Sequence, residues 1–228
     1  MARTESKSPA RNSQQVLQAY VPMVRYIADI IGPRCEVVLH DVKDPSNSIV
    51  AIRNGYISGR SIGGPMTDLG LKLIEASPHM DEEALINYGS KTSYGDKLVS
   101  STYFIRDDAG VLTGLLCVNI LKDGMPSSPS FLSGVEAHMM QDHLSQDKET
   151  MVNELLSTSP DQVIRQAVES VLEHGEISVD RLTFEEKKDM IYRLQKNGIF
   201  KIKGAVTQVG AMLGIADSTV YRYLSSIK

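Results

Sequence analysis

The chain has no tryptophan, and only four phenylalanines and two cysteines among its 228 residues. Both cysteines, Cys35 and Cys117, lie in strongly apolar stretches. We therefore expect buried free thiols in a reducing compartment, and neither a disulfide framework nor a reactive nucleophile. No apolar run approaches the length of about 18 residues that would span a membrane, and the polar start, MARTESKSPARNSQQ, lacks the apolar stretch of a signal peptide. These absences predict a cytoplasmic protein that does not enter a membrane.

Patterns that carry catalysis or bind metals are also scarce. No glycine-rich phosphate loop precedes a Lys-Ser or Lys-Thr pair. His138 and Asp142 can share a helix face with His143 nearby, but no third ligand follows at a spacing that suits a metal ion. We therefore expect no enzymatic activity, no metal and no cofactor.

What the chain does contain is enough apolar sequence for two ordinary domains. Hydrophobic residues make up 42% of the chain and charged residues 23%, as in a typical soluble protein. The net charge of −4 is unevenly distributed, because basic residues outnumber acidic ones from Arg181 onward whereas the preceding part is acidic. A basic end on an acidic body indicates that only this end meets a polyanion.

The front part shows alternating helix and strand patterns. Residues 14–31 have apolar side chains at helical spacing, with Pro22 inside the pattern, so the helix should begin near Pro22 or bend there. A glycine-rich connection over 54–66 precedes a short helix over 67–76, which Thr67 or Asp68 would cap. Strand patterns cover residues 35–40, 48–53, 84–92, 97–106 and 111–121. The simplest solution is an α+β fold, in which helices cover one face of a five-stranded antiparallel sheet and enclose any cavity.

These patterns divide the chain into four parts. Residues 1–13 read as a disordered lead-in, and residues 14–122 as the sheet domain. Residues 123–180 read as a linker followed by connecting helices at 131–144 and 160–173, the second opened by a capping box of Ser159 and Gln162. The remainder, 181–228, carries the sharpest motif.

This final segment has the spacing of a helix-turn-helix. A capping box of Thr183 and Glu186 opens its first helix. A helix over 204–213 is followed by Gly214, which supplies the positive φ of the turn, and then by a helix over 217–226. Gly210 is small where two helices must touch, and Ile215 fills the angle between them.

The outer face of the last helix is then free to read double-stranded DNA. Ser218, Thr219, Tyr221 and Arg222 can reach groove edges or phosphates, and Lys201 and Lys203 can contact the phosphate backbone. The alternative is an amphipathic helical hairpin that mediates dimerisation, with its basic residues merely solvated.

Four motifs closely resemble the YheO-like family of bacterial regulators, which includes the DauR regulators. They are GPRCEVVLHD (32–41), SIVAIRNGYISGR (48–60), GGPMTDLGL (63–71) and LGIADSTVYRYL (213–224). The resemblance covers about residues 14–228 and implies a PAS-like sensor domain joined to a helix-turn-helix domain. One position departs from the common helix-turn-helix pattern: Ala216 stands where a Ser or Thr usually caps the recognition helix, so we expect Asp217 to act as the cap.

The resemblance also implies a sensor pocket for a small polar effector such as an amino acid. Candidate lining residues follow the first two strands or lie on later ones: His40, Asp41, Asn54, Tyr56, Arg60, Tyr103 and Asn119. The alternative is that these polar groups only hydrogen-bond the glycine-rich segment and bind nothing.

Together these features predict a ligand-responsive, sequence-specific DNA-binding transcription regulator. The apolar stripes of 131–144 and 160–173 predict a homodimer or larger assembly, because two copies are normally needed for adjacent half-sites. The alternative function is a ligand-binding signalling or scaffold module whose C-terminal helices contact protein instead of DNA.

Overall fold

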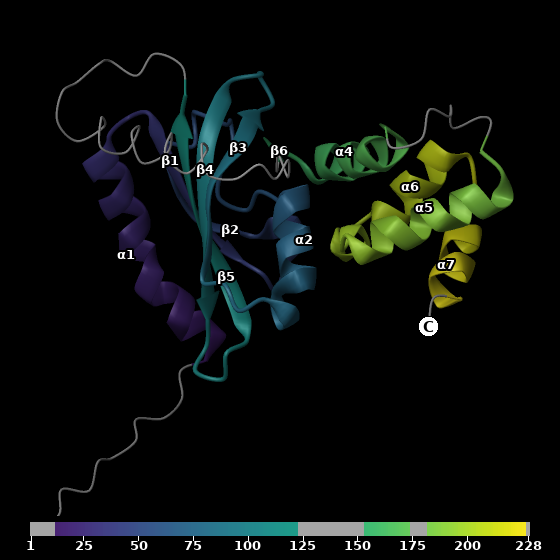
Figure 1. Cartoon of the computed structure of the whole chain (residues 1–228), viewed down its shortest axis with the longest axis horizontal. Coiled ribbons are helices and arrows are strands. Elements are labelled where there is room, and N and C mark those ends of the chain that lie inside the picture. Colours follow the sequence, from purple (N-terminus) through teal and green to yellow (C-terminus); the bar gives the residue numbers. More distant parts are fainter. Residues whose placement is uncertain (1–11, 123–152, 174–181, 227–228) are drawn as a thin grey trace, which may run out of the picture.

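A computed structural model describes residues 12–122, 153–173 and 182–226 (Figure 1). The helix expected over 131–144, and with it His138, Asp142 and His143, lies outside these ranges. In the described part, a curled sheet with helices on both faces precedes a group of four α-helices and one short 3-10 helix. None of the described helices is long and apolar enough to cross a membrane.

The first helix, α1 (Ser13–Ile31), begins earlier than Pro22 and runs through it. Asn12 caps α1, because its side chain accepts from the backbone N–H of Gln15 while the Gln15 side chain accepts from the backbone N–H of Asn12. This reciprocal pair satisfies two of the N–H groups that a helix start leaves unpaired. The helix therefore does not begin near Pro22, the first of the two predicted alternatives.

The sheet contains the five predicted strands and one more. Its spatial order is β2-β1-β5-β4-β3-β6, and the first five strands pair antiparallel with their neighbours. The sixth pairs parallel with β3 at the edge and was not predicted. The bounds are β1 (Cys35–Asp41), β2 (Ile49–Arg53), β3 (Ala84–Thr92), β4 (Lys97–Arg106), β5 (Leu112–Leu121) and β6 (Asn153–Leu156). The short helices η1 (Pro45–Asn47) and η2 (Ser77–His79) lie in connections.

Helices cover both faces of the sheet, not one as predicted. Alternate residues of β1 separate the two sides: Val37 and Leu39 pack under α1, whereas Val38 packs in the cluster that includes α2 (Asp68–Ala76). The Thr67 hydroxyl caps α2 by accepting from the N–H of Gly70. Successive side chains of a strand point to opposite faces of the sheet, which produces this division. Because both faces of the sheet carry apolar side chains, each face needs a helix to cover it.

The C-terminal helices extend the core on the α2 side of the sheet. They are α4 (Pro160–Glu173), α5 (Phe184–Lys196), η4 (Ile199–Lys201), α6 (Ala205–Leu213) and α7 (Asp217–Ser225). Val163, Ile164 and Val168 of α4 are fully buried within the chain, where α4 contacts α5 and α6. The last two residues of its apolar stripe, Val171 and Leu172, are half-buried. The buried part of this stripe therefore packs within the chain, and the pairing with a second copy that we expected for it stays a prediction.

The capping box predicted for α4 is only half formed. The Ser159 hydroxyl accepts from the N–H of Gln162, but the Gln162 side chain accepts from Thr158 in place of Ser159. The Gln162 side chain therefore holds Thr158, one residue before the predicted partner Ser159.

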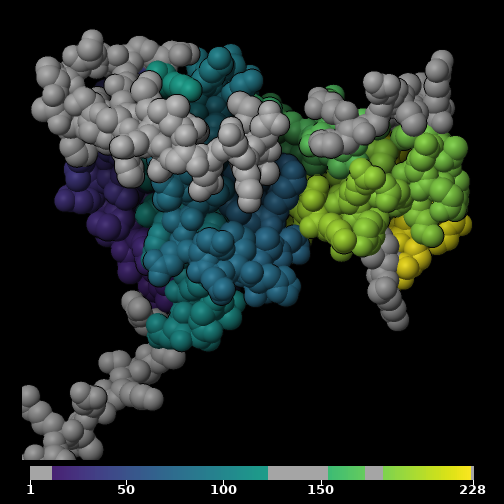
Figure 2. Space-filling view, viewed as in Figure 1, coloured from purple at the N-terminus to yellow at the C-terminus, as the bar shows by residue number. Residues whose placement is uncertain are grey.

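The helical part contacts the sheet domain along a narrow zone beside α2 (Figure 2). Lys201 of η4 lies 2.7 Å from the Glu75 carboxylate of α2. The backbone N–H of Lys203 donates to the Ser46 hydroxyl of η1 at 2.8 Å. Buried apolar residues continue from Leu71 of α2 into the helical core, so the two parts share packed contacts.

Candidate nucleic-acid interface and buried polar network

The turn between α6 and α7 has the predicted geometry. Gly214 adopts φ +63 at the end of α6, and the N–H of Ile215 donates back to the Gly210 carbonyl. A Cβ on Gly210 would lie 2.9 Å from the Ile215 carbonyl oxygen, closer than carbon and oxygen pack without a shift. Glycine at both positions therefore allows the two helices to meet at this angle.

The start of α7 differs from the expectation for Asp217. The cap position is Ala216, which supplies no side-chain hydrogen bond, and Asp217 is the first helical residue. Its carboxylate accepts from the Thr207 hydroxyl at 2.6 Å and so joins α7 to α6. A carboxylate in the first turn also faces the positive end of the helix dipole. Asp217 thus secures the helix start by a bridge and not as a cap.

One side of α7 is buried and the other faces solvent. Val220 is fully buried and Tyr223 is 3% exposed, with the Tyr223 ring edge-on to Phe184 at 5.2 Å. Sequence reasoning assigned Val220 but not Tyr223 to this inner side. On the outer side, Ser218, Tyr221 and Arg222 are exposed and Thr219 is half-buried. The four predicted DNA-reading residues are thus brought together on one short helix.

The two lysines expected at the phosphate backbone lie at the boundary with the sheet domain. Both are exposed, but the Lys201 ammonium is paired with Glu75. The Lys203 backbone is held by Ser46, while its side chain remains solvated. In this arrangement, Lys201 must leave Glu75 before it can neutralise a phosphate.

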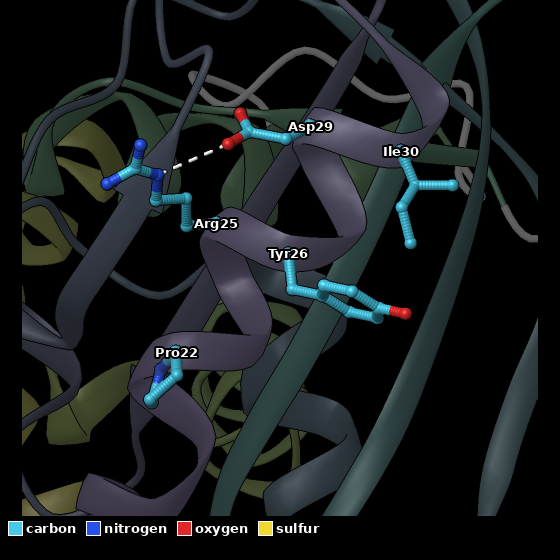
Figure 3. A pocket seen from close by; sticks show the side chains of 5 residues that line it. All are labelled: Pro22, Arg25, Tyr26, Asp29 and Ile30. Atoms are coloured by element: carbon cyan, nitrogen blue, oxygen red, sulfur yellow. Dashed lines mark hydrogen bonds and ion pairs between the residues drawn. The ribbon is translucent and has the colours of Figure 1, made fainter.

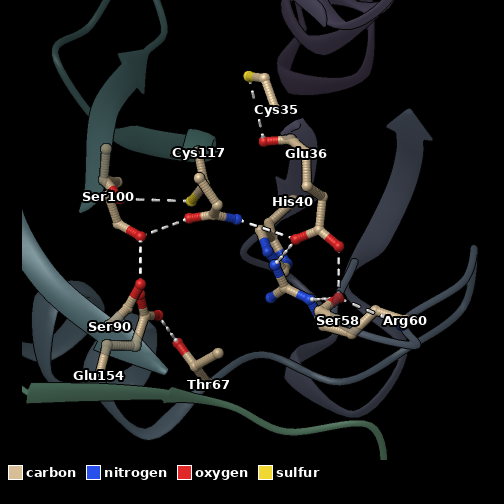
Figure 4. A network of polar contacts seen from close by, with 12 residues as sticks. Cys35, Glu36, His40, Ser58, Arg60, Thr67, Ser90, Ser100, Cys117 and Glu154 are labelled. Carbon is tan, nitrogen blue, oxygen red and sulfur yellow. Dashed lines mark hydrogen bonds and ion pairs between the residues drawn. The ribbon is translucent and has the colours of Figure 1, made fainter. Parts of the chain in front are cut away.

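A second cluster of polar groups is buried on the face of the sheet that α2 covers (Figure 4). At one end, Arg60 donates to the Glu36 carboxylate at 2.5 Å, and neither side chain is more than 2% exposed. The Ser58 hydroxyl donates to the same carboxylate. Burying two charges is costly unless they are paired and hydrogen-bonded, and this group meets both conditions.

From Glu36 the hydrogen bonds continue across the sheet. The Asn119 amide donates to Glu36 at 2.9 Å, and the Asn119 carbonyl accepts from the Ser100 hydroxyl at 2.8 Å. Because Ser100 donates to Asn119, Ser90 must donate to Ser100. The bonds therefore run in one direction from β3 through β4 and β5 to β1.

The edge strand β6 contributes Glu154 to the same face. Its carboxylate accepts from the Thr67 hydroxyl at 2.6 Å and from the Tyr88 hydroxyl at 3.0 Å. Tyr88 also contacts Thr102 at 2.9 Å. Burial raises the pKa of Glu154, while the Thr67 hydrogen bond, the Arg60 charge and the Tyr88 hydrogen bond act in the opposite direction. Among the described residues, no cationic side chain lies in an ion pair with Glu154 as Arg60 does with Glu36.

His40 is held beside this network in its neutral form. Its Nδ1 lies 2.8 Å from the Ser48 hydroxyl. Burial, together with the nearby positive charge of Arg60, lowers the pKa of His40 to about 3. Burial likewise raises the pKa of the Cys35 and Cys117 thiols to about 12, so both cysteines stay protonated at neutral pH.

Of the predicted effector-binding residues, the structure brings together only His40, Arg60 and Asn119. Asp41 accepts from the backbone N–H of Lys43 at the end of β1. Asn54 has φ 57 and donates to the Cys35 carbonyl, which makes it a support for the turn after β2.

The two predicted tyrosines lie away from the network. Tyr56 is 68% exposed and donates to the Pro33 carbonyl. Tyr103 lies on the α1 side of the sheet, beside Tyr20 at a ring distance of 6.3 Å. Tyr103 therefore faces away from the network on the opposite side of the sheet.

Sequence reasoning missed both buried carboxylates. Glu36 lies in the apolar strand CEVVLH, at a position where strand alternation places it on the same face as Val38 and His40. An acid in that position was a usable signal, because a buried charge requires a partner. Glu154 gave no such signal, since the short segment NELL was not recognised as a strand.

Two family profiles match the chain in the regions just described. One, for the YheO-like PAS domain, matches residues 11–135. The other, for an HTH domain, matches residues 163–225, which include most of α4 as well as the helices of the turn motif.

Relatives resemble the chain over most of its length. YheO of Escherichia coli K12 is 32% identical over 215 residues, 93% of this chain and 85% of that protein. A Haemophilus influenzae protein is 31% identical, covering 94% and 92%. The transcriptional regulator DauR of Pseudomonas aeruginosa is 27% identical, covering 93% and 94%. The phage VqmA–DPO complex has a TM-score of only 0.32 at 10% identity, with 92% and 89% coverage, a likeness too weak to bear on fold or function.

Proposed function

The chain belongs to the family of proteins with a YheO-like PAS domain, and on that premise we propose that it is a DNA-binding transcriptional regulator whose sheet domain senses a small polar metabolite. The α6–α7 turn carries the DNA-binding part of this proposal. Its inner side is buried, and its outer side presents Tyr221, Arg222 and Ser218 to solvent. A helix so placed can enter the major groove without disturbing its own core.

The buried network supports the sensing part. It occupies the sheet face between the strands and the Asn54–Pro65 segment, with charged groups that the protein keeps out of water at a cost. One cation, Arg60, and two carboxylates, Glu36 and Glu154, lie there. An amino acid has the complementary pair of charges: its carboxylate suits Arg60, and its ammonium suits Glu154. Because side chains of the protein fill the network, such an effector would have to exchange partners with them.

Two connections can carry a change in the network to the DNA-binding helices. Glu154 lies on β6, which is followed directly by α4, and the loop between them is tied to α4 by Ser157–Gln166 and Thr158–Gln162 hydrogen bonds. The second connection is the Glu75–Lys201 pair between α2 and η4. An effector that favours one arrangement of these contacts would shift the population of DNA-binding states.

The test is a gel-shift titration of the full chain on DNA upstream of its own gene, repeated over a range of salt and with single amino acids. DNA binding predicts a loss of affinity as salt rises, because phosphate contacts release counterions. Sensing predicts that one class of amino acid changes the protein concentration at which half of the DNA is bound. Failure to retain DNA at low salt would favour the alternative, a module whose C-terminal helices bind protein.

A further inference from the structure

The outer face of α1 has an apolar stripe that nothing in the described part of the chain covers. Met23 is 38% exposed, Tyr26 60% and Ile30 54%, and Ala19 and Pro22 are exposed as well. These five residues recur at helical spacing, so they form one line along the helix. The opposite side of α1, with Val16, Leu17, Val24 and Ala28, is already buried on the sheet.

This concentration is unusual for the molecule. No other described helix carries three exposed large apolar side chains, and Ile62, Tyr94 and Val111 lie in separate loops. Scattered residues of that kind need no explanation. A line of them along one helix marks a contact surface.

Charged groups border the stripe in a self-complementary order. Figure 3 shows Tyr26 and Ile30 on one flank of the outer face, and Arg25 and Asp29 on the other. The Arg25 Nε lies 3.2 Å from the Asp29 carboxylate, which also pairs with Arg53 of β2. Only the Nε of Arg25 is used in this bond, so its remaining N–H groups are free to reach a second carboxylate.

We propose that the α1 stripe binds the same stripe of a second copy of this chain, with the two helices antiparallel about a two-fold axis near Tyr26. In an antiparallel two-fold pairing, each flank of one helix lies against the same flank of the other helix, and the two chains run in opposite directions. Pro22 and Ile30 lie at equal separations from Tyr26, so Pro22 of one copy faces Ile30 of the other. Arg25 and Asp29 are centred on Ile27, the next residue, so nearly the same register places each Arg25 against the other copy's Asp29.

This interface is separate from the DNA-binding surface. α1 covers one face of the sheet, whereas α2 and the C-terminal helices lie on the other side (Figure 1). Pairing through α1 therefore leaves α7 free in both copies. Any further pairing between the DNA-binding parts would add to it, which allows assemblies larger than a dimer.

The first test compares Ile30→Glu with Ile62→Glu, a matched change at an exposed isoleucine outside α1. Light scattering at micromolar concentration should show the mass of the Ile30→Glu variant halved relative to the parent, and that of the Ile62→Glu variant unchanged. An unchanged mass for Ile30→Glu would overturn the proposal. Gel shifts on the same variants report separately on DNA binding, because α7 is untouched.

The second test uses the otherwise native chain with Tyr26→Cys and a short bismaleimide, since the two natural thiols are buried. A two-fold axis near Tyr26 predicts a covalent dimer from this single cysteine, and none from Ile62→Cys. Modification of the new cysteine without a cross-link would show an open, unpaired surface. Protection of that cysteine in a monomer would show that another segment of the same chain covers α1. Either result rejects the second copy as the occupant.

Discussion

Arg60 reaches the strand β1 from the glycine-rich connection after β2, and its guanidinium lies 2.5 Å from the carboxylate of Glu36 with both groups out of water. The pair fixes an irregular loop to β1. Ser58 and Asn119 satisfy further sites on the same carboxylate. The glycine-rich connection is thus anchored to the sheet by a buried ion pair.

Replacing Glu36 by Gln should destabilise the protein by about 3–5 kcal/mol, because the Arg60 charge would remain buried without its counterion. Urea denaturation measures the change. The double variant Glu36→Leu/Arg60→Met, which removes both charges, should regain much of the loss. A single variant as stable as the parent would mean that water reaches Arg60 in solution.

His40 should make stability depend on pH in the acidic range. Its pKa is about 3 in the folded chain and near the ordinary value of 6.5 in the unfolded chain, so the unfolded state binds more protons between these values. The free energy of unfolding should therefore fall as pH drops from about 6.5, by up to about 1.4 kcal/mol per pH unit.

The His40→Asn variant should lack this dependence while keeping a polar group for Ser48. Denaturation curves of parent and variant between pH 7 and pH 4 give the difference directly. The raised pKa of Glu154 acts in the opposite sense, since its protonation favours the folded state, but it is present in both proteins. Parallel curves would contradict the assignment of a neutral, buried His40.

Arg222→Ala should weaken DNA binding by about 1–3 kcal/mol if the guanidinium contacts a base, and by less if it contacts only phosphate. The side chain is exposed and lies 5.6 Å from the Tyr223 ring, so the melting temperature should hardly change. Arg193→Ala removes the same charge from the exposed side of α5 and serves as control. Equal losses in both variants would show a general charge effect.

Gly210→Ala should destabilise the helical part by about 1–3 kcal/mol, the usual range for overpacking. The new Cβ would meet the backbone oxygen of Ile215, which cannot rotate away. Ala211→Gly, at the exposed neighbouring position, should cost about 1 kcal/mol through helix propensity alone. If Gly210→Ala proved stabilising, as propensity by itself predicts, the contact between α6 and the turn would be looser than described.

Glu75→Gln should strengthen DNA binding slightly, because it frees Lys201 from the sheet domain. The side chains of Lys201 and Glu75 are 46% and 35% exposed, so the gain in binding free energy should not exceed about 1 kcal/mol. Lys201→Gln should weaken binding and cancel the effect of Glu75→Gln in the double variant. Independent effects of the two changes would place Lys201 away from DNA.

Much of the fold was predictable because it follows local patterns. Alternation located β3 and β4 at their observed bounds, and the turn chemistry of Gly214 and the Thr183–Glu186 box located the C-terminal helices. The strand β6 was not predictable in this way, since four residues carry little periodicity and its pairing with β3 is set by distant sequence. The site was harder for the same reason: residues such as Glu154 and Thr67 meet only through the tertiary fold.

The late position of β6 in the chain has a consequence for synthesis on the ribosome. β3 is made before β4 and β5, yet within the described residues its outer edge has no partner until β6 emerges. An open strand edge of this kind in a nascent chain invites misassembly. During this interval the Thr67 and Tyr88 hydroxyls also lack the Glu154 carboxylate to which they donate in the folded chain. Because α4 follows β6 almost at once, the sheet can close just as the DNA-binding helices begin to appear, and a message truncated before β6 would yield a product with its edge uncapped.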